Sequence, residues 1–451
     1  MVYKCQKCGF IHEGKMPDGY FCPYCHANLF DFKLISEEEQ IYKRVLIEQD
    51  NPAINRIEEK CINCGACSKI CQSVVGLSPD DKKHVCLNCG QCILSCPKGA
   101  LTPKYDYQTV WELINVPDTK VVVMTSPAVR VAIGDAFDEP AGAFLEGKMV
   151  AALKQLGFDY VFDTNFGADL TVVEEVAEFI KRIETGGQLP LFSSCCPSWV
   201  KYLHNFHPEL VPHLSTCKSP IGMEAAVLKE IFAKEEGINP EKLVVVALTP
   251  CTAKKQEILN NECDYVITTG ELALLIREQN IDFKKLKDEK FDSVTGTSSI
   301  FGATGGVALS VIRAYYHEVT GKHLDDDLLL IKDKDFYQEY SVKVKNKIIK
   351  CAVVYSLTNV EKLIPILSDF AFVEVMNCRA GCIGGGGQCL MPAKALPELL
   401  AKRAEGLKRT DKGDKIKRAY ENPLVKELYE DHLEAPLSAR SKELLHIDGA
   451  H

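Results

Sequence analysis

The sequence has no apolar run that approaches the roughly 20 residues needed to span a bilayer. Its first residues, MVYKCQKCGF, also lack the charged, apolar and small-residue regions of a secretory signal. Basic side chains are not in excess, because 62 Asp and Glu residues outnumber 53 Lys and Arg residues and give a net charge of -9. Such a charge argues against nucleic acid as a partner. We therefore expect a cytoplasmic protein that binds neither membranes nor nucleic acid.

Cysteine, in contrast, is abundant: it accounts for 21 of the 451 residues, and ten of them stand at C-x2-C spacing. In a reducing compartment this pattern indicates metal ligation rather than disulfides. The chain is longer than the roughly 250 to 300 residues at which single hydrophobic cores stop growing, so we expect more than one domain. Changes in the pattern along the chain divide it into residues 1–33, 34–55, 56–105, 106–393 and 394–451.

Residues 1–33 contain two cysteine knuckles, YKCQKCGF and GYFCPYCHA. They offer four thiolates to one tetrahedral metal: Cys5, Cys8, Cys22 and Cys25. The segment is too short for an apolar core, so the metal must supply its stability. The pattern resembles the abbreviated rubredoxin domain of rubrerythrins, which implies a redox-active iron, while a structural zinc ribbon fits the same spacing.

Residues 34–55 contain the stretch SEEEQIYKRVLIEQ, in which Ser36 and Glu39 fit a capping box. We expect a solvated helical linker there.

Residues 56–105 hold two matching runs, CINCGACSKIC and CLNCGQCILSCP. Both have the spacing of bacterial two-cluster ferredoxins, in which the fourth cysteine ligates the other cluster. One predicted 4Fe-4S site consists of Cys61, Cys64, Cys67 and Cys96. The other consists of Cys71, Cys86, Cys89 and Cys92. Zinc or a structural role is the alternative, but eight cysteines seldom fall into this double register for another reason.

From about residue 118 the pattern alternates between apolar strands and amphipathic helices. The strands are KVVVMTS, DYVFDTN, LPLFSSC, KLVVVALTP, YVITTGE and FAFVEVM, and TVVEEVAEFIKRIETGG is one of the helices. Continuous apolar strands with helical crossovers predict an α/β catalytic domain of two lobes, with parallel sheets flanked by helices. Ligands bind such sheets beyond the carboxyl ends of the strands.

Three cysteine-containing segments each follow one of these strands: FSSCCPSW, TPCTAKKQE and EVMNCRAGCIGGGGQC. Together they offer Cys196, Cys251, Cys378 and Cys382, which are enough to hold one more 4Fe-4S cluster. We expect the glycine run 384–387 to let the backbone approach a bulky cofactor. A buried set of structural cysteines is the alternative.

These three segments closely resemble the signature motifs of iron-only (FeFe) hydrogenases. The resemblance extends from the ferredoxin repeats to HLEAPLSARSKELLH, so that residues 394–451 resemble the hydrogenase small subunit as a C-terminal helical segment. It implies that the four cysteines bind the cubane of an H-cluster. It also implies that Cys382 bridges to a two-iron subsite with carbon monoxide, cyanide and azadithiolate ligands.

The resemblance further implies reversible oxidation of dihydrogen. Electrons would pass through the 4Fe-4S clusters to or from a ferredoxin-like or rubredoxin-like carrier, and maturation enzymes would build the two-iron subsite. Two alternatives are a hydrogen-sensing member of the same family with low turnover, and a non-catalytic iron-sulfur electron-transfer or assembly protein. The free thiol Cys195 argues against both.

Roles for other residues follow from the same resemblance. Lys254 would hydrogen-bond a cyanide, and Cys195 would exchange a proton beside the open coordination site. The pocket would be lined by Met376, Phe301, Ser126 and Pro127. A proton relay would run from Cys195 through Glu175, Ser215, Glu178 and Arg182. Lys255, next to Lys254, is expected to be a surface charge.

The sequence departs from the family pattern at Ser126, Ile221 and Thr249, and in the pair Gln388-Cys389, where the family has Gln-Pro. Side chains around a cofactor tune its potential and rate, so the catalytic bias stays open. The four remaining cysteines are expected to be small buried hydrophobic residues: Cys217, Cys263, Cys351 and Cys389.

Overall fold

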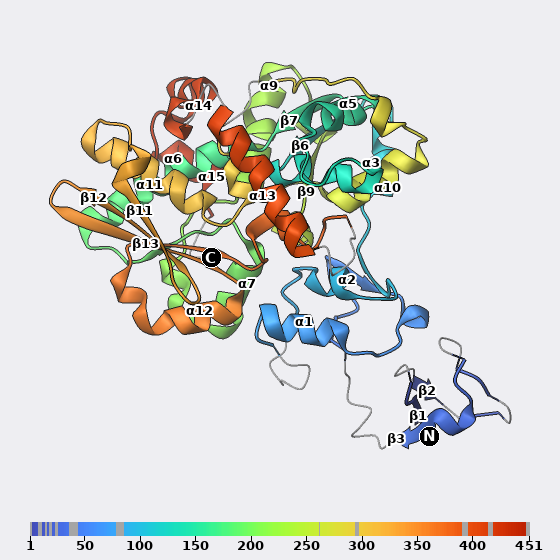
Figure 1. The fold of residues 1–451 in the computed structure, drawn as a ribbon. Helices are drawn as coiled ribbons and strands as arrows, with labels where there is room; N and C mark the ends of the chain where they lie inside the picture. Colours follow the sequence, from blue (N-terminus) through green and yellow to red (C-terminus); the bar gives the residue numbers. More distant parts are fainter. Residues whose placement is uncertain are drawn as a thin grey trace.

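The computed structural model describes residues 2–7, 11–13, 16–17, 20–22, 26–35, 44–77, 85–260, 262–293, 297–389, 396–413 and 418–447. Figure 1 shows a large body with two sheets, a smaller part below it that carries the first two helices, and a small N-terminal sheet at the far end. No helix within these residues is both long and apolar enough to cross a membrane.

The N-terminal sheet has the order β2-β1-β3 and is antiparallel. Its strands are β1 (Val2–Cys5), β2 (Ile11–Glu13) and β3 (Phe32–Ile35). Cys5 and Cys22 are fully buried and pack with Ala27. Cys8 and Cys25 lie outside the described residues, so the structure places half of the predicted four-thiolate set.

The helix predicted for residues 34–55 is wrong in the described part of that segment. Residues 34 and 35 belong to β3, residues 44–53 contain no helix, and Ser36 and Glu39 lie outside the described residues. The backbone of Val45 bonds elsewhere: its N–H donates to Cys67 Sγ (3.4 Å), and its carbonyl accepts from Arg56 (2.6 Å). These contacts with the following segment take the place of helical hydrogen bonds.

Two short helices and a two-stranded sheet follow. The antiparallel strands are β4 (Ile54–Arg56) and β5 (Leu101–Pro103), and the helices are α1 (Ala66–Val74) and α2 (Gln91–Ser95). Each helix begins after a glycine in the left-handed conformation, Gly65 (φ 78°) and Gly90 (φ 67°). These glycines let a cysteine loop turn sharply into a helix.

The first lobe of the large body is built on a four-stranded parallel sheet of order β10-β9-β6-β7. Its strands are β6 (Lys120–Thr125), β7 (Tyr160–Asp163), β9 (Leu243–Thr249) and β10 (Tyr265–Thr268). Val121 and Val123 of β6 pack on one face with α3 (Tyr107–Ile114), α5 (Glu146–Leu156) and α10 (Thr269–Glu278). Val122 and Met124 face α8 (Pro220–Val227) on the other side. Coverage of both faces explains the continuous apolar strands.

The second lobe has five strands in the order β11-β12-β13-β14-β8. The parallel strands are β8 (Leu191–Phe192), β14 (Phe372–Met376) and β13 (Lys347–Tyr355), and the antiparallel ones are β12 (Gln338–Val344) and β11 (Leu329–Asp333). One face is covered by α6 (Asn165–Thr185) and α11 (Gly306–Thr320), the other by α7 (Pro197–Phe206) and α12 (Leu357–Leu363). The prediction of parallel sheets is therefore incomplete, because β11 and β12 add an antiparallel edge.

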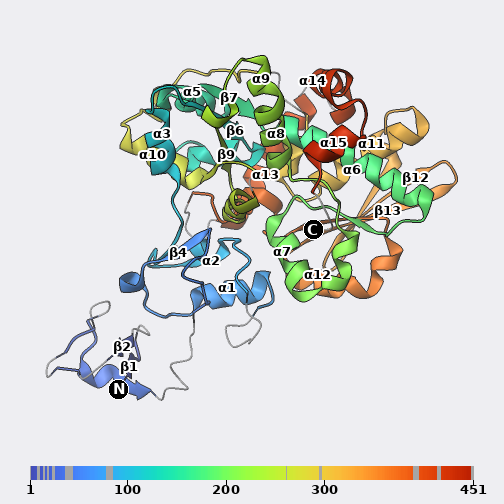
Figure 2. The ribbon, with the colours of Figure 1, turned by 180° about the vertical axis from the view of Figure 1, so that it is seen from behind.

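The C-terminal segment consists of helices that join the two lobes. They are α13 (Leu396–Gly413), α14 (Pro423–Leu428) and α15 (Ala439–Leu445). In Figure 1, α13 crosses the body between the two sheets, and Figure 2 shows α14 and α15 beside α6 and α8. Arg403 of α13 is buried, forms an ion pair with Asp135 and donates to the Ile383 carbonyl (2.6 Å).

Lys255, expected on the surface, is completely buried. Its ammonium lies 2.5 Å from Asp106, 3.2 Å from Glu271 and 2.6 Å from the Val266 carbonyl. Three acceptors thus satisfy the buried charge, and the lysine ties the start of the first lobe to β10 and α10.

Replacing Lys255 with alanine should lower the free energy of unfolding by about 3 to 5 kcal/mol, because Glu271 then stays buried without its cation. Urea unfolding would measure the loss. The control is Lys242→Ala, whose exposed ammonium lies 3.9 Å from Asp118 and should contribute less than about 1 kcal/mol. Equal losses in the two variants would contradict a structural role for the buried pair.

Candidate active site

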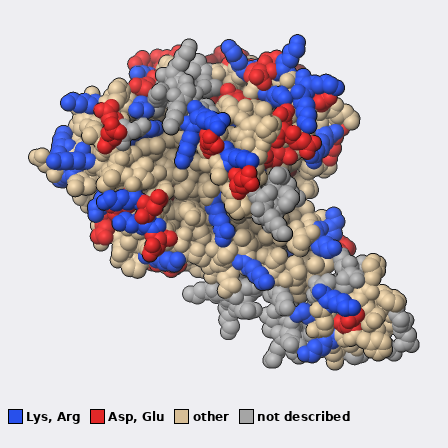
Figure 3. Space-filling model, viewed as in Figure 1, with Lys and Arg blue, Asp and Glu red and all other residues tan. Residues whose placement is uncertain are grey.

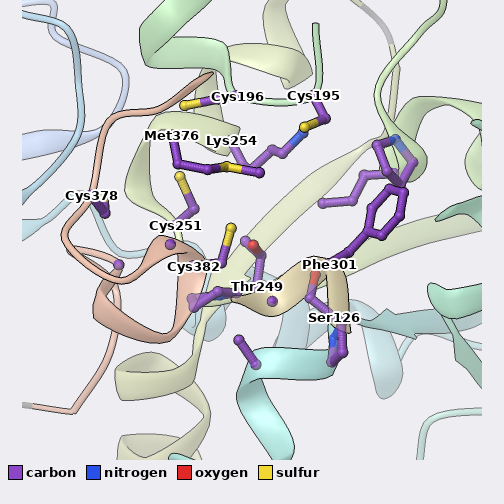
Figure 4. Close-up of a pocket in the computed structure, with 18 of the residues that line it drawn as sticks. Ser126, Cys195, Cys196, Thr249, Cys251, Lys254, Phe301, Met376, Cys378 and Cys382 are labelled. Carbon is purple, nitrogen blue, oxygen red and sulfur yellow. The ribbon is translucent and has the colours of Figure 1, made fainter. Parts of the chain in front are cut away.

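The carboxyl ends of strands from both sheets surround one cavity. Ser126 follows β6, Cys196 follows β8, Cys251 follows β9 and Cys378 follows β14, and all four line this cavity together with Cys382. The four cysteines predicted to hold a cluster therefore meet at the junction of the lobes, as Figure 4 illustrates.

Three thiols of this set, those of Cys251, Cys378 and Cys382, have raised pKa values. Burial, followed by the charge of Cys196, raises the pKa of Cys382 to about 12. Burial and the neighbouring cysteines also raise the pKa of Cys378 well above its usual range. Four buried thiolates would repel one another, and metal binding deprotonates a thiol outright. The donor set therefore fits a cationic metal cluster.

The remaining predicted pocket residues line the same cavity: Lys254, Met376, Phe301, Ser126 and Pro127. Lys254 is buried, and its ammonium contacts the Glu257 carboxylate at 2.6 Å. Although burial opposes its charge, Glu257 raises the pKa of this lysine above its usual value. Glu257 also accepts from the Ser219 hydroxyl (2.9 Å), so it fixes the position of Lys254. Figure 4 shows Lys254 reaching toward Cys195.

The glycine run 384–387 packs closely against neighbouring backbone, and Gly385 also lines the cavity. A Cβ on Gly385 would lie 2.3 Å from the Pro250 carbonyl oxygen, and one on Gly386 would lie 2.3 Å from that of Cys89. The backbone of the run therefore packs directly against the backbone of two neighbouring loops, and protein atoms occupy the space that a Cβ would fill.

The cysteines of residues 56–105 lie in two groups. A second cavity is lined by Cys61, Cys64, Cys67 and Cys96. Burial, then the charges of Cys89 and Cys86, raises the pKa of Cys71. Burial, then the charges of Cys89, Cys86 and Cys71, likewise raises the pKa of Cys92. Each predicted ligand set therefore occupies its own place.

The start of α2 contacts the loop of the large body that contains Cys378 and Gly384. The side-chain amide of Gln91 donates to Cys378 Sγ (3.3 Å) and to the Gly384 carbonyl (2.8 Å). The Thr252 hydroxyl donates to the Asn88 carbonyl (2.6 Å). These contacts place the second cysteine group next to the cavity.

The predicted relay residues lie along α6 and the strand-end loops. Arg182 donates to Glu178 Oε1 through Nε (3.0 Å) and Nη2 (2.5 Å). The Ser215 hydroxyl lies 3.4 Å from Glu178 Oε2. Glu175 is buried, and within the described residues neither of its carboxylate oxygens has a hydrogen-bond partner at normal length. Burial, followed by the charge of Glu178, raises the pKa of Glu175 to about 8.

Cys195 lines the cavity beside Cys196. Burial, then the charge of Glu175, raises the pKa of its thiol well above the usual value. A neutral thiol therefore lines the cavity and feels the charge of Glu175, the next residue of the predicted relay.

The positions that depart from the family pattern also lie near the cavity. Ser126, Ile221 and Thr249 line it, and the Gln388 amide donates to the Ala128 carbonyl (3.3 Å). The four unassigned cysteines are buried, as expected, each in a hydrophobic cluster: Cys217, Cys263, Cys351 and Cys389.

Sequence reasoning missed two groups that organise this site. Glu257 fixes Lys254, and its spacing of three residues from the lysine within a helical turn was the available signal. Glu374 accepts from the backbone N–H groups of Gly305 (2.7 Å) and Ala308 (2.8 Å), which holds the start of α11 against β14. No local pattern marks a buried carboxylate of that kind.

Known proteins share this arrangement. The family described as iron-only hydrogenase large subunit, C-terminal domain, matches residues 119–386, and iron hydrogenase small subunit matches residues 397–448. The chain is 40% identical over 437 residues to the NADP-reducing hydrogenase subunit HndD of Solidesulfovibrio fructosivorans, a match that covers 87% of this chain and 74% of that protein. It is 30% identical over 356 residues to the cytosolic iron-sulfur assembly component 3 of Bos taurus, covering 72% and 73% respectively. A solved structure of the apo FeFe-hydrogenase HydA1 of Chlamydomonas reinhardtii matches with a TM-score of 0.68 and 32% identity, over 75% of this chain and 97% of that one.

The raised pKa of Glu175 predicts a pH dependence of stability. An ordinary glutamate loses its proton near pH 4.5 and the buried Glu175 near pH 8, so between these values the native state binds more protons than the unfolded state. The contribution of Glu175 to stability is fully present below about pH 4.5 and is lost as the pH rises through 8. Glu175→Gln should remove this contribution, worth up to about 1.4 kcal/mol per pH unit.

Urea unfolding of wild type and variant at pH 5, 6.5 and 8 measures the slope. The exposed Glu184→Gln on the same helix is the matched control and should keep the wild-type slope. An unchanged slope in the Glu175 variant would show that this carboxyl is ionised in the native protein.

Proposed function

Because the chain belongs to the iron-only hydrogenase family, whose reaction is the oxidation of dihydrogen and the reduction of protons at an H-cluster, we propose that it turns over in both directions with Cys195 as its proton-exchanging thiol. The observation that carries this proposal is a single cavity lined by four thiols for the cubane, one further thiol and a buried ammonium. A scaffold for a cluster alone needs neither of the last two.

The chain supplies ligands, orientation and exclusion of water. In the proposal Cys196, Cys251, Cys378 and Cys382 hold the cubane, and Lys254 donates to a cyanide ligand. When bound, the H-cluster supplies the heterolytic cleavage and formation of dihydrogen. Water is excluded by the apolar parts of Met376, Phe301 and Pro127, with Ser126 beside them. Maturation enzymes would complete the two-iron subsite.

Protons would pass between Cys195 and the outside along α6. The thiol exchanges a proton with Glu175, and Ser215 connects Glu175 to Glu178. Stepwise transfer needs acceptors within hydrogen-bonding reach and with suitable pKa values. The Glu175 pKa of about 8 lets this carboxyl hold a proton near neutral pH. Arg182 fixes Glu178 at the outer end.

Electrons would pass through the two 4Fe-4S clusters of residues 56–105. The cavity of Cys61, Cys64, Cys67 and Cys96 is also lined by basic side chains: Arg44, Arg56, Lys60 and Lys98. None of its lining residues within the described chain is acidic, and Figure 3 shows Lys and Arg along this lower part of the molecule. Such a surface favours an acidic carrier of the ferredoxin type. The N-terminal four-thiolate site, with iron or zinc, would be a further point of contact, including for a rubredoxin-like carrier.

The similarity to an iron-sulfur assembly component supports a second candidate, a non-catalytic assembly protein. The two candidates differ in whether the two-iron subsite is present. Anaerobic infrared spectroscopy of protein matured with the maturation enzymes should show bands of iron-bound carbonyl and cyanide. Absence of these bands from fully matured material would exclude the hydrogenase proposal.

In the same material, Cys195→Ala should keep the infrared bands and lower hydrogen evolution by about 100-fold or more, the range of a lost proton-transfer group. Gas chromatography of evolved hydrogen measures the rate. The matched control is Cys351→Ala, which removes a buried thiol outside the cavity lining. Full activity of the Cys195 variant would remove this thiol from the relay.

Replacing Gln91 with leucine should lower the midpoint potential of the cubane, because hydrogen bonds to cluster sulfurs favour the reduced state. Infrared titration at controlled potential measures the shift. The control is Gln256→Leu. The Gln256 amide donates to the Pro197 carbonyl (3.1 Å), and within the described residues it makes no hydrogen bond to a sulfur atom. A potential unchanged by the Gln91 substitution would show that the 3.3 Å contact with Cys378 is absent from the loaded protein.

A further inference from the structure

A hydrogen-bonded chain leads from the relay carboxylate Glu178 to an imidazole on the C-terminal segment. The Thr216 hydroxyl lies 3.0 Å from Glu178 Oε2 and 2.7 Å from Nδ1 of His446, which directly follows α15. The other ring nitrogen, Nε2, lies 3.0 Å from Oε2 of Glu174. Glu174, Glu178 and His446 are buried and Thr216 is half-buried, so the chain of contacts runs through the protein interior.

The protons available to these hydrogen-bonded groups allow two arrangements in which every contact between them is a hydrogen bond. Thr216 has one hydroxyl proton to donate. In the first arrangement Glu178 is ionised and accepts from Thr216, while His446 donates from Nδ1 to Thr216 and from Nε2 to Glu174. In the second, Glu178 carries a proton and donates to Thr216, which donates to Nδ1 of a neutral His446. The Nε2–H still donates to Glu174.

The two arrangements contain the same number of protons. They interconvert when the Nδ1 proton of His446 moves to the Thr216 oxygen while the Thr216 proton moves to Glu178 Oε2, or by the reverse shift. No heavy atom has to move beyond hydrogen-bonding distance. The net result is transfer of one proton between Glu178 and His446, and no other reactant is needed.

Arg182, which also contacts the Glu178 carboxylate, cannot take part in such an exchange. A guanidinium has five N–H donors, no acceptor and a pKa too high for deprotonation in a protein. Imidazole, in contrast, is the side chain whose charge changes between about pH 5 and 8. The hydroxyl bridge therefore links Glu178 to a group that can both take and return a proton.

We propose that His446 is a proton store for the relay and exchanges protons with Glu178 through Thr216. This inference rests on the proposed function, in which Glu178 carries protons. It assigns a role in proton transfer to the C-terminal segment, in addition to its packing. His446 acts through Glu178 and does not touch the cofactor cavity.

The titratable groups that face His446 are Glu174, Glu178 and the thiol of Cys217. Atoms of Glu178, Cys217 and His446 that could ligate a metal lie within 4.8 Å of one another. Burial raises the pKa of Cys217 well above its usual range, so this thiol stays neutral. Although burial opposes it, hydrogen bonds from His446, Tyr429 and the backbone lower the pKa of Glu174. An ionised Glu174 accepts the Nε2–H in both arrangements.

Activity of the matured full-length protein tests the bridge. Thr216→Val removes the hydroxyl but leaves His446 bonded to Glu174, and His446→Gln removes the store. We expect each to slow hydrogen oxidation about tenfold, part of the effect of a positioned proton acceptor, and to change its pH profile in the same way. The double variant should be no slower than the single ones, because both changes interrupt one route.

Tyr429→Phe is the matched control for a purely structural role. It removes a 2.6 Å hydrogen bond to Glu174 but leaves the contacts among Glu178, Thr216 and His446 in place. We expect lower thermal stability with an unchanged pH profile of activity. The proposal is wrong if Thr216→Val has wild-type activity, or if His446→Gln behaves like Tyr429→Phe.

A second readout is independent of turnover. Histidine 15N NMR of the protein without the two-iron subsite can follow His446, whose signals are those lost in His446→Gln. Glu178→Gln and Thr216→Val should each shift the titration of these signals, and the exposed Glu184→Gln should not. Unchanged signals in the first two variants would overturn the exchange. Coupling seen by NMR without carbonyl and cyanide bands after maturation would instead contradict the proposed function alone.

Discussion

The structure depends on one electrostatic constraint: buried thiols can be gathered as thiolates only around a positive centre. Cys251 comes from the first lobe, whereas Cys196 and Cys378 come from the strand ends of the second. Burial and the charges of neighbouring cysteines raise the pKa of Cys251 and of Cys378, so without metal these two thiols are neutral. A cluster would turn this unfavourable arrangement into a junction between lobes, because each thiolate then has a cation to bind.

The rest of the chain is arranged around that junction. The Gly386 backbone packs against the carbonyl of Cys89, which brings the N-terminal cysteine groups to the cavity. From the other side, Arg403 of α13 binds the Ile383 carbonyl, within the loop that contains Cys382. The segment that carries the last cluster ligand is therefore held by the N-terminal part and by the C-terminal helices.

Local sequence patterns predicted the features that depend on local chemistry. The apolar runs became strands β6 to β10 and β14, and the family predicted from the three cysteine segments is confirmed by the matches over residues 119–386 and 397–448. Local sequence patterns gave wrong predictions where a residue distant in the sequence determines the structure. Lys255 is buried because Asp106 and Glu271 bind its ammonium. The segment around Val45 is not helical, and the Val45 carbonyl accepts a hydrogen bond from Arg56 instead. The ligand sets, which cysteine spacing predicted, and the relay, which the family resemblance implied, stay predictions.

In the proposed function, electron and proton routes must reach the same cavity, because an uncompensated charge in a buried site is energetically unfavourable. An electron that arrives from the side of α2 adds negative charge in a region of low dielectric constant, and a proton that follows removes this cost. Cys195 lies at the cavity wall with Glu175 next to it, and this carboxyl is protonated near neutral pH because it is buried beside Glu178. Glu178, in contrast, is bound by Arg182 and by the Thr216 backbone (3.0 Å). Two carboxyl groups on one face of α6 thus differ in environment, and the stepwise proton path proposed above depends on this difference.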